Sequence, residues 1–182
     1  MTSLLSLQAQ TLEEPTAIAA LDDARNRLGS LGILYDQLYT TDARGRSSLR
    51  EYLQQLVLSE IEVFPHGDRV EVHSEIEECL CTAKTLSSLG LIVNELITNA
   101  MKYAFANHPN PELTLLGVSQ FEHYTLTVQD NGPGCLEPDE RQTSSGFGLT
   151  IVRVLTEQLG GSIRFENDHG ARAILEFPVG ES

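Results

Sequence analysis

The chain of 182 residues lacks any long apolar run, and basic residues and cysteines are few. No segment approaches the roughly 18 consecutive apolar residues that a membrane-spanning helix needs. The start, Met1 to Gln8, lacks the basic residues and long apolar run of a signal peptide. We therefore expect a cytoplasmic chain with no membrane contact of its own. Attachment to a longer or membrane-associated protein stays open.

Basic residues are scarce, with 12 Lys and Arg against 26 Asp and Glu and a net charge of -14. Nucleic-acid binding depends on cationic side chains that displace counterions from phosphates, so this charge argues against a nucleic-acid partner. A bound nucleotide would need local groups to hold it and a metal ion to offset the repulsion. The hydrophobic content of 41% is otherwise that of a globular protein.

The chain has three cysteines, Cys79, Cys81 and Cys135. An odd number of cysteines without the spacing of a disulfide framework indicates a reducing compartment. Cys79 and Cys81 could share a metal ion. No second pair of Cys or His stands nearby at ligand spacing, which favours small side chains in or near a strand.

The first 48 residues are predicted to form a helical hairpin and a linker. Pro15 breaks the first arm from the second. The second arm carries an apolar stripe at helical spacing, made of Ile18, Leu21, Leu28, Leu31, Leu34 and Leu38. Pairing with a second copy into a four-helix bundle would bury this stripe, and packing against the following domain is the alternative. Residues 40–48 are small and polar and indicate a linker that ends in a helix cap at Ser48.

The second domain, 49–182, mixes helices and strands without a regular βαβ alternation. Helices are expected over 49–64, 86–105 and 148–159, and strands over 70–73, 112–119, 124–130, 162–166 and 171–177. Residues 65–68 indicate a turn. The fold class is therefore α+β, with helices stacked on one face of a mixed sheet.

The helix expected over 86–105 places Glu95, Asn99 and Lys102 on a common face. A carboxylate and an amide oxygen are hard ligands that suit Mg²⁺, and a lysine can meet a phosphate as a point charge. Asn99 is thus a candidate Mg²⁺ ligand, with Glu95 as a second candidate. Taken alone, this face would more simply be a solvated surface with an i,i+4 polar pair.

Two glycine-rich turns follow. Asp130 ends an alternating strand and precedes Gly132 and Gly134, so backbone can approach a ligand closely beside its carboxylate. Gly146 and Gly148 precede a helix, where free amides and the helix dipole favour an anion such as a triphosphate. The second turn matches neither a Walker loop nor a dinucleotide fingerprint. Each alone could be an ordinary turn or helix entry.

In order and spacing, the three motifs resemble the N box and glycine boxes of the GHKL family, shared by histidine kinases, Hsp90, type II topoisomerases and MutL proteins. The resemblance covers about residue 49 to the end and implies a Bergerat fold, a two-layer α/β sandwich that binds ATP with Mg²⁺ beneath a mobile lid at 135–145. It implies that Asn99 coordinates Mg²⁺, Lys102 approaches the phosphates and Asp130 bonds the adenine amino group. The full ATP-binding set is Asn99, Lys102, Asp130, Gly132, Gly134, Gly146, Phe147, Gly148 and Leu149, and Glu95 and Asn99 are the catalytic candidates.

The segments around Ser3 to Gln10, Arg25 to Arg27 and Glu157 to Gly161 are similar to the HisKA_2 and HWE-like histidine kinases. This similarity implies a homodimer through the N-terminal helices and phosphoryl transfer to a histidine, then to a response-regulator receiver domain. The phosphoacceptor histidine of that group would lie before the start of this chain, and no histidine precedes His66. The five histidines present are interpreted as surface residues.

Alternatives stay open at this stage. One alternative is a GHKL ATPase, because Glu95 also stands where the hydrolytic relatives have the general base that activates water. A non-catalytic phosphotransfer or interaction module on the same scaffold is another. Ala171 follows Gly170 where many relatives have threonine, whose hydroxyl supports the adenine-binding aspartate. This departure predicts weak nucleotide affinity.

Overall fold

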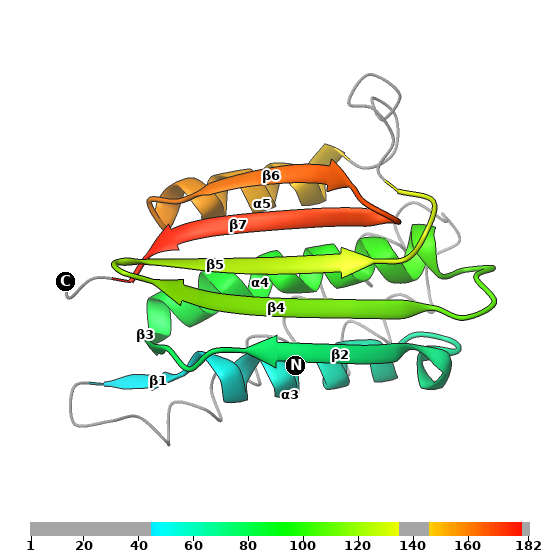
Figure 1. The fold of residues 1–182 in the computed structure, drawn as a ribbon, viewed down its shortest axis with the longest axis horizontal. Coiled ribbons are helices and arrows are strands. Elements are labelled where there is room, and N and C mark those ends of the chain that lie inside the picture. The colour runs from blue at the N-terminus through cyan, green and yellow to red at the C-terminus, as the bar shows by residue number, and fades with distance from the viewer. Residues whose placement is uncertain (1–44, 135–145, 180–182) are drawn as a thin grey trace, which may run out of the picture.

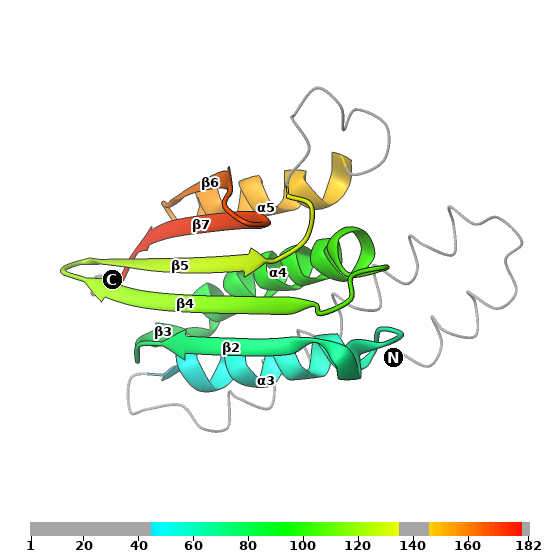
Figure 2. The same cartoon turned by 45° about the vertical axis from the view of Figure 1, so that its right-hand side comes forward.

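The computed structural model describes residues 45–134 and 146–179. Its centre is one five-stranded sheet covered on one face by three helices (Figure 1). In spatial order the strands are β2 (Glu71–Ile76), β4 (Glu112–Gln120), β5 (His123–Asp130), β7 (Ala171–Pro178) and β6 (Ser162–Asn167). The turned view shows the helices behind the sheet as a second layer (Figure 2). This is the expected α+β two-layer arrangement.

The sheet is mixed because its first pair is parallel. β2 runs parallel to β4, with Glu71 opposite Glu112, and every other neighbouring pair is antiparallel. A parallel pair needs a long crossover, and the chain between β2 and β4 contains the central helix of the helical layer. The end of β5 is therefore surrounded by segments distant in sequence.

The helices begin where the sequence supplies capping side chains. α3 (Leu49–Glu62) starts after Ser48, whose side chain accepts a bond from the Glu51 amide at 3.1 Å. This confirms the expected cap. α4 (Ala83–Asn99) starts in the same way after Thr82, which accepts from the Thr85 amide at 3.2 Å. α5 (Gly146–Gln158) ends before Gly160, which takes a positive φ of 68°.

The core lies between the sheet and the helices, and α4 is buried on almost every side. It contacts both α3 and α5. Its buried residues are Leu86, Ser88, Leu89, Gly90, Ile92, Val93, Asn94, Glu95, Ile97 and Thr98. Of its apolar residues, Leu89 and Val93 are fully buried, whereas Leu96 is only half-buried. Polar groups on this helix therefore face protein.

Part of the expected linker is a strand. β1 (Arg46–Ser48) pairs antiparallel with β3 (Leu80–Thr82), with Ser47 opposite Cys81, in a separate two-stranded ribbon. These three residues of the expected linker thus form a short strand. Their partner lies more than thirty residues away, and a three-residue strand is too short to show alternation. β3 agrees with the interpretation of the Cys79 and Cys81 segment as small side chains in or near a strand.

Two short helical segments replace simpler expectations. The turn expected at 65–68 is followed by the 3₁₀ segment η2 (Gly67–Arg69). The single helix expected over 86–105 is α-helical only to Asn99 and continues as a π-helical turn, η3 (Ala100–Ala104). There the Phe105 amide donates to the Ala100 carbonyl at 2.9 Å. π-Turns within helices often occur at functional sites.

Two predictions lie outside the described residues: the N-terminal helical hairpin and the lid at 135–145. In the part of the chain that the structure describes, no helix is long and apolar enough to cross a membrane.

Candidate functional site

The carboxylate of Asp130 is fixed at the end of β5 by two backbone amides. Its Oδ1 accepts hydrogen bonds from the amide of Gly132 at 2.9 Å and from the amide of Ala171 at 3.1 Å. Within the described residues, no hydrogen bond is recorded to Oδ2. One carboxylate oxygen therefore positions the group while the other remains available to a ligand.

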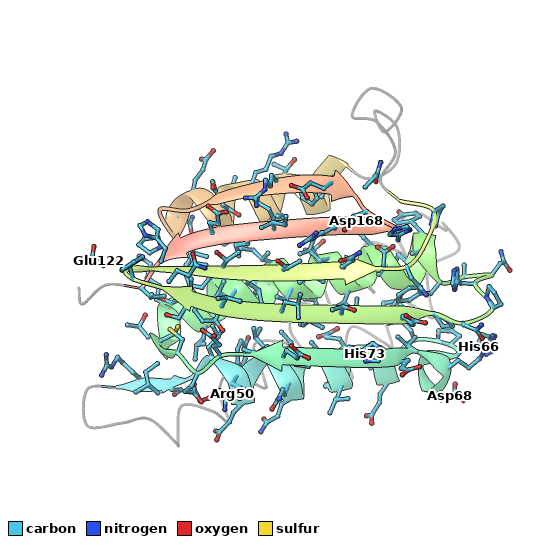
Figure 3. The ribbon with its side chains drawn as sticks, viewed as in Figure 1. Arg50, His66, Asp68, His73, Glu122 and Asp168 are labelled. Atoms are coloured by element: carbon cyan, nitrogen blue, oxygen red, sulfur yellow. The ribbon has the colours of Figure 1, made fainter. Side chains whose placement is uncertain are left out.

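The turn between β6 and β7 packs directly on Asp130. Gly170 has a φ of 143°, and a Cβ built on it would lie 1.8 Å from the Asp130 carbonyl oxygen. Gln129 on β5 donates its side-chain amide to the Asp168 carbonyl at 2.6 Å, which holds the same turn. Asp168 lies at the end of the sheet where β5 ends (Figure 3). Only a glycine at position 170 allows this approach.

The glycine turn after β5 touches the C-terminal part of the helix that carries the first motif. A Cβ on Gly132 would lie 2.4 Å from the Cβ of Ala104 in η3. Gly134 has a φ of 89°, and a Cβ there would lie 2.8 Å from the side chain of Asn167. The turn thus joins the end of β5 to η3 on one side and to the end of β6 on the other.

Glu95 lies beside the first turn of α5. Only 6% of its surface is exposed, and a Cβ on Gly148 would lie 2.6 Å from its Oε2. A carboxylate here is favoured by the helix dipole and the free amides of a helix start. The alternative of a solvated face is therefore excluded for Glu95, because the start of α5 covers it. The chain places an anion of its own where a phosphate was expected.

Asn99 and Lys102 lie between these two contacts along the helix. Asn99 is half-buried at the last position of α4, and Lys102 is exposed in η3. The two residues therefore belong to helical segments of different periodicity. Lys102 also borders a pocket of about 280 Å³ whose other basic residues are His66, Arg69 and His108. Neither Asn99 nor Asp130 lines that pocket.

A buried carboxyl group, Glu60 on α3, was not recognised in the sequence. It is 4% exposed and bonds the side chain of Asn94 on α4. The pKa of Glu60 is raised from the ordinary value of 4.5 to about 7. Burial is the largest cause, the bond with Asn94 lowers the pKa, and the charge of the nearby Glu95 raises it. The available signal was its position on the apolar stripe of α3, next to the buried Ile61.

The predicted site residues converge on the C-terminal end of α4 from three directions. Glu95 meets Gly148 on α5, Ala104 meets Gly132 after β5, and Gly132 bonds Asp130. Leu149 lies in the first turn of α5 and is half-buried. Gly146 begins α5, and the side chain of Phe147 is outside the description.

Two family models match the chain. Residues 85–181 match the histidine kinase-, DNA gyrase B-, and HSP90-like ATPases, and residues 1–64 match HisKA_2 histidine kinases. The first match alone spans more than half of the chain. The chain belongs to the histidine kinase-, DNA gyrase B- and HSP90-like ATPases. Together, the two matches identify it as a histidine kinase catalytic and ATPase region, as the resemblance of its motifs implied.

Individual relatives agree. The chain is 28% identical over 94% of its length to the signal transduction histidine-protein kinase/phosphatase UhpB of Salmonella typhimurium, and covers 31% of that protein. It is 26% identical over 78% of its length to blue-light-activated histidine kinase 2 of Erythrobacter litoralis, and covers 42% of it. The chain thus spans less than half of either relative.

A solved structure shows the same fold. The histidine kinase domain of the Erythrobacter litoralis blue-light-activated kinase EL346 superposes with a TM-score of 0.76 at 20% identity. The match covers 98% of this chain and 94% of that one. At this level of identity the likeness supports the fold and not the roles of single residues.

Proposed function

We propose that this histidine kinase region binds Mg-ATP at the C-terminal end of α4 and transfers the γ-phosphoryl group to a histidine. An aspartate on a response-regulator receiver domain is the next acceptor. The observation that carries the proposal is the Asp130 carboxylate, held by the amides of Gly132 and Ala171 beside the end of the N-box helix. The match to the ATPase family implies ATP binding. In this proposal, the contacts of Asp130 hold its carboxylate in place to bind the adenine base.

Asp130 would select adenine. An exocyclic amino group is a hydrogen-bond donor, and the Oδ2 atom of Asp130 is the acceptor that the described contacts leave available. Gly132 and Gly134 allow the backbone to pass close to η3 and β6, which shapes the wall of the base pocket. The Ala171 amide supports Asp130, and the threonine hydroxyl that many relatives have at this position would add to that support.

Asn99 and Lys102 would hold the metal and phosphates. The described residues contain no group of three His, Cys, Asp or Glu that could hold a metal by themselves. A donor set of one amide oxygen suits Mg²⁺, which usually keeps waters and bridges substrate phosphates. ATP supplies the transferable phosphoryl group, and the protein contributes positioning and charge neutralisation. Gly146, Phe147, Gly148 and Leu149 complete the proposed ATP-binding set.

Glu95 would act at the start of α5. Its carboxylate contacts the position of Gly148, so it can hold that glycine turn against α4. In that place it can also orient the attacking histidine or accept its proton, with Asn99 one helical turn away. Glu95 is also a candidate second ligand of Mg²⁺.

The HisKA_2 match supports a proposal for the domain organisation and the assembly. We propose that residues 1–48 form the dimerisation and phosphotransfer hairpin with its linker, and that residues 49–182 form the catalytic domain. The protein would work in the cytoplasm as a homodimer through its N-terminal helices. The acidic surface makes a nucleic-acid partner unfavourable.

Replacing Asn99 by alanine tests the metal assignment. Isothermal titration with ATP should show loss of the Mg²⁺-dependent part of the affinity, at least about tenfold, while circular dichroism remains unchanged. Asn107→Ala is the matched control, since Asn107 is exposed a short distance along the chain. Full retention of Mg-ATP affinity in Asn99→Ala would contradict the assignment.

Phosphotransfer is tested with labelled ATP and a separate histidine-bearing helix of the same kinase type. We expect acid-labile phosphate on that helix when the intact chain is present, and none with Asn99→Ala. If free phosphate is released at the same rate with and without the added helix, and the helix carries no label, the protein would be a simple ATPase.

A further inference from the structure

Cys81 is the middle residue of β3 and Cys79 lies just before that strand. The ribbon of β1 and β3 is at the opposite end of the sheet from the end of β5 (Figure 1). Their Sγ atoms are 3.7 Å apart and share a hydrogen bond. Cys81 is 5% exposed, and Cys79 is half-buried and reachable from solvent. An approach of roughly 1.7 Å would bring the sulfurs to covalent distance. The two thiols can therefore react with one partner.

The two thiols are not equivalent. The hydrogen bond from Cys81 lowers the pKa of Cys79, and Arg46 acts in the same direction, against burial and the charge of Glu78. The same hydrogen bond, burial and Glu78 raise the pKa of Cys81 well above its usual range. Because the thiolate is the nucleophile, Cys79 is the first to attack and Cys81 stays protonated until a disulfide is next to it.

The surroundings fix the backbone of this pair and leave one side chain adjustable. The carbonyl of Cys79 accepts from the Leu49 amide at 2.9 Å, and its own amide donates to Glu78 at 2.9 Å. Cys79 lies just before β3 and is not part of a strand ladder. From the sheet, Tyr124 faces the pair, and burial and the charges of both cysteines raise its pKa, so it stays neutral.

We propose that Cys79 and Cys81 form a thiol–disulfide exchange site for low-molecular-weight disulfides, in which Cys79 attacks and Cys81 resolves. The Cys79 thiolate attacks one sulfur of the small disulfide, a mixed disulfide forms, and the other sulfur leaves as a thiolate and takes up a proton. Cys81 then gives up its proton and attacks the Cys79 sulfur, and a second small thiol leaves. The cysteine pair loses two electrons, and the small disulfide is reduced to two thiols.

The cysteine pair lies at the junction between β1 and α3. Both cysteines lie between the two family matches, which end at residue 64 and begin at residue 85. The Cys79 carbonyl holds the first residue of α3, and Glu78 accepts the hydroxyl of the cap residue Ser48 at 2.9 Å. The exchange site therefore acts where β1 joins α3, away from the proposed nucleotide site.

Intact mass after reaction with oxidised glutathione tests the proposal. The test uses the full chain with Cys135→Ser, because Cys135 is the remaining cysteine. After quenching, this protein should be lighter by two hydrogen atoms and carry no glutathione, and peptide mapping should join Cys79 to Cys81. With Cys81→Ala added, one glutathione should stay on Cys79. With Cys79→Ala added, modification should be lost over the same period.

Two outcomes would overturn the proposal. One is a stable mixed disulfide on Cys79 in the Cys135→Ser protein. The other is a Cys79→Ala variant that reacts as fast as its parent. Binding of phenylarsine oxide, which bridges two thiols, provides an independent measurement on folded protein. One equivalent should bind the Cys135→Ser protein and none should bind either single variant, and binding that survives the loss of one thiol would also refute the pairing.

Discussion

The two ends of the central sheet are held together by different kinds of contact. At the Asp130 end, the contacts of Asp130 itself are with backbone: two amides bond one carboxylate oxygen, and the backbone of Gly170 lies against the Asp130 carbonyl. The side chains of Gln129 and Asn131 bond the neighbouring turns. None of these bonds uses the side chains of Asn99 or Lys102. In the proposed function, the side chains at the Asp130 end of the sheet therefore bind the nucleotide.

At the opposite end, side chains hold the connections. The Tyr124 hydroxyl donates to the Glu77 carbonyl at 2.6 Å, and Arg50 at the start of α3 donates to the Ile76 carbonyl at 2.7 Å (Figure 3). Tyr124 also packs on Phe177, with ring centroids 5.6 Å apart. This end uses its polar groups for stability, so damage there should affect the fold more than nucleotide binding.

The largest effect is expected from Gly170→Ala. The new Cβ would collide with the Asp130 backbone in a conformation that alanine disfavours, so unfolding free energy should fall by more than about 3 kcal/mol. Gly160→Ala is the matched control: its φ is also positive, but its nearest neighbour is the Pro178 side chain at 3.7 Å. It should lose about 1 kcal/mol in urea unfolding. Equal losses would show that the approach of Gly170 to Asp130 is unimportant.

The next largest effect concerns Glu60. Its pKa is raised from 4.5 to about 7 in the folded protein, so the fold loses stability as pH rises between these values. Glu60→Gln keeps a polar partner for Asn94 and cannot ionise. The variant should match the parent near pH 4.5 and exceed it by up to roughly 3 kcal/mol above pH 7, measured by urea unfolding at each pH. Parallel stability curves for the two proteins would contradict this.

A smaller effect is expected from Tyr124→Phe at the opposite end. The Glu77 carbonyl would lose its donor while the ring packing on Phe177 is kept, which should cost about 1 to 2 kcal/mol. ATP affinity, measured by titration at a temperature where the variant is fully folded, should not change. A drop in affinity as large as that of Asn99→Ala would mean that the two ends do not differ as described.

The smallest effect is expected from Ala171→Thr at the Asp130 end. The Ala171 amide already supports the carboxylate, and a threonine hydroxyl could add a second bond. We expect ATP affinity to rise by a few-fold, which is within about 1 kcal/mol. Ala173→Thr on the same strand is unsuitable as a control because Ala173 is buried, and Arg172→Thr is unsuitable because Arg172 pairs with Asp168 in the turn beside Asp130. Ser162→Thr, at an exposed position on β6, serves instead. Weaker binding by Ala171→Thr alone would show that the hydroxyl cannot be accommodated.

The sequence predicted the long elements well because their periodicity is strong. The strands over 112–119 and 124–130 and the helix after Gly148 are confirmed to within a few residues. β1 and β3 were missed as a pair because three residues carry no measurable alternation. The π-turn after Asn99 was missed because the sequence spacing still fits an α-helix.

The burial of acidic side chains was also not predicted from the sequence. Glu60 and Glu95 are polar residues in amphipathic helices, which the pattern assigns to solvent. The structure buries both because α4 is covered by α3 on one side and by α5 on the other. The roles of Asn99, Lys102, Asp130 and the glycines stay predictions that the convergence of the motifs supports.

By itself, the sequence determined the family, the order of the elements and the chemical groups at hand, because motif spacing and apolar periodicity are local properties of the chain. Only the tertiary structure decided which groups meet: the Ala171 amide at Asp130, Glu95 at the start of α5 and the two thiols beside β1. Those contacts join segments far apart in sequence, and the packing that creates them also removes water. Burial of this kind raises the pKa of Glu60, and the hydrogen bond between Cys79 and Cys81 makes the two thiols different. No local pattern encodes either effect.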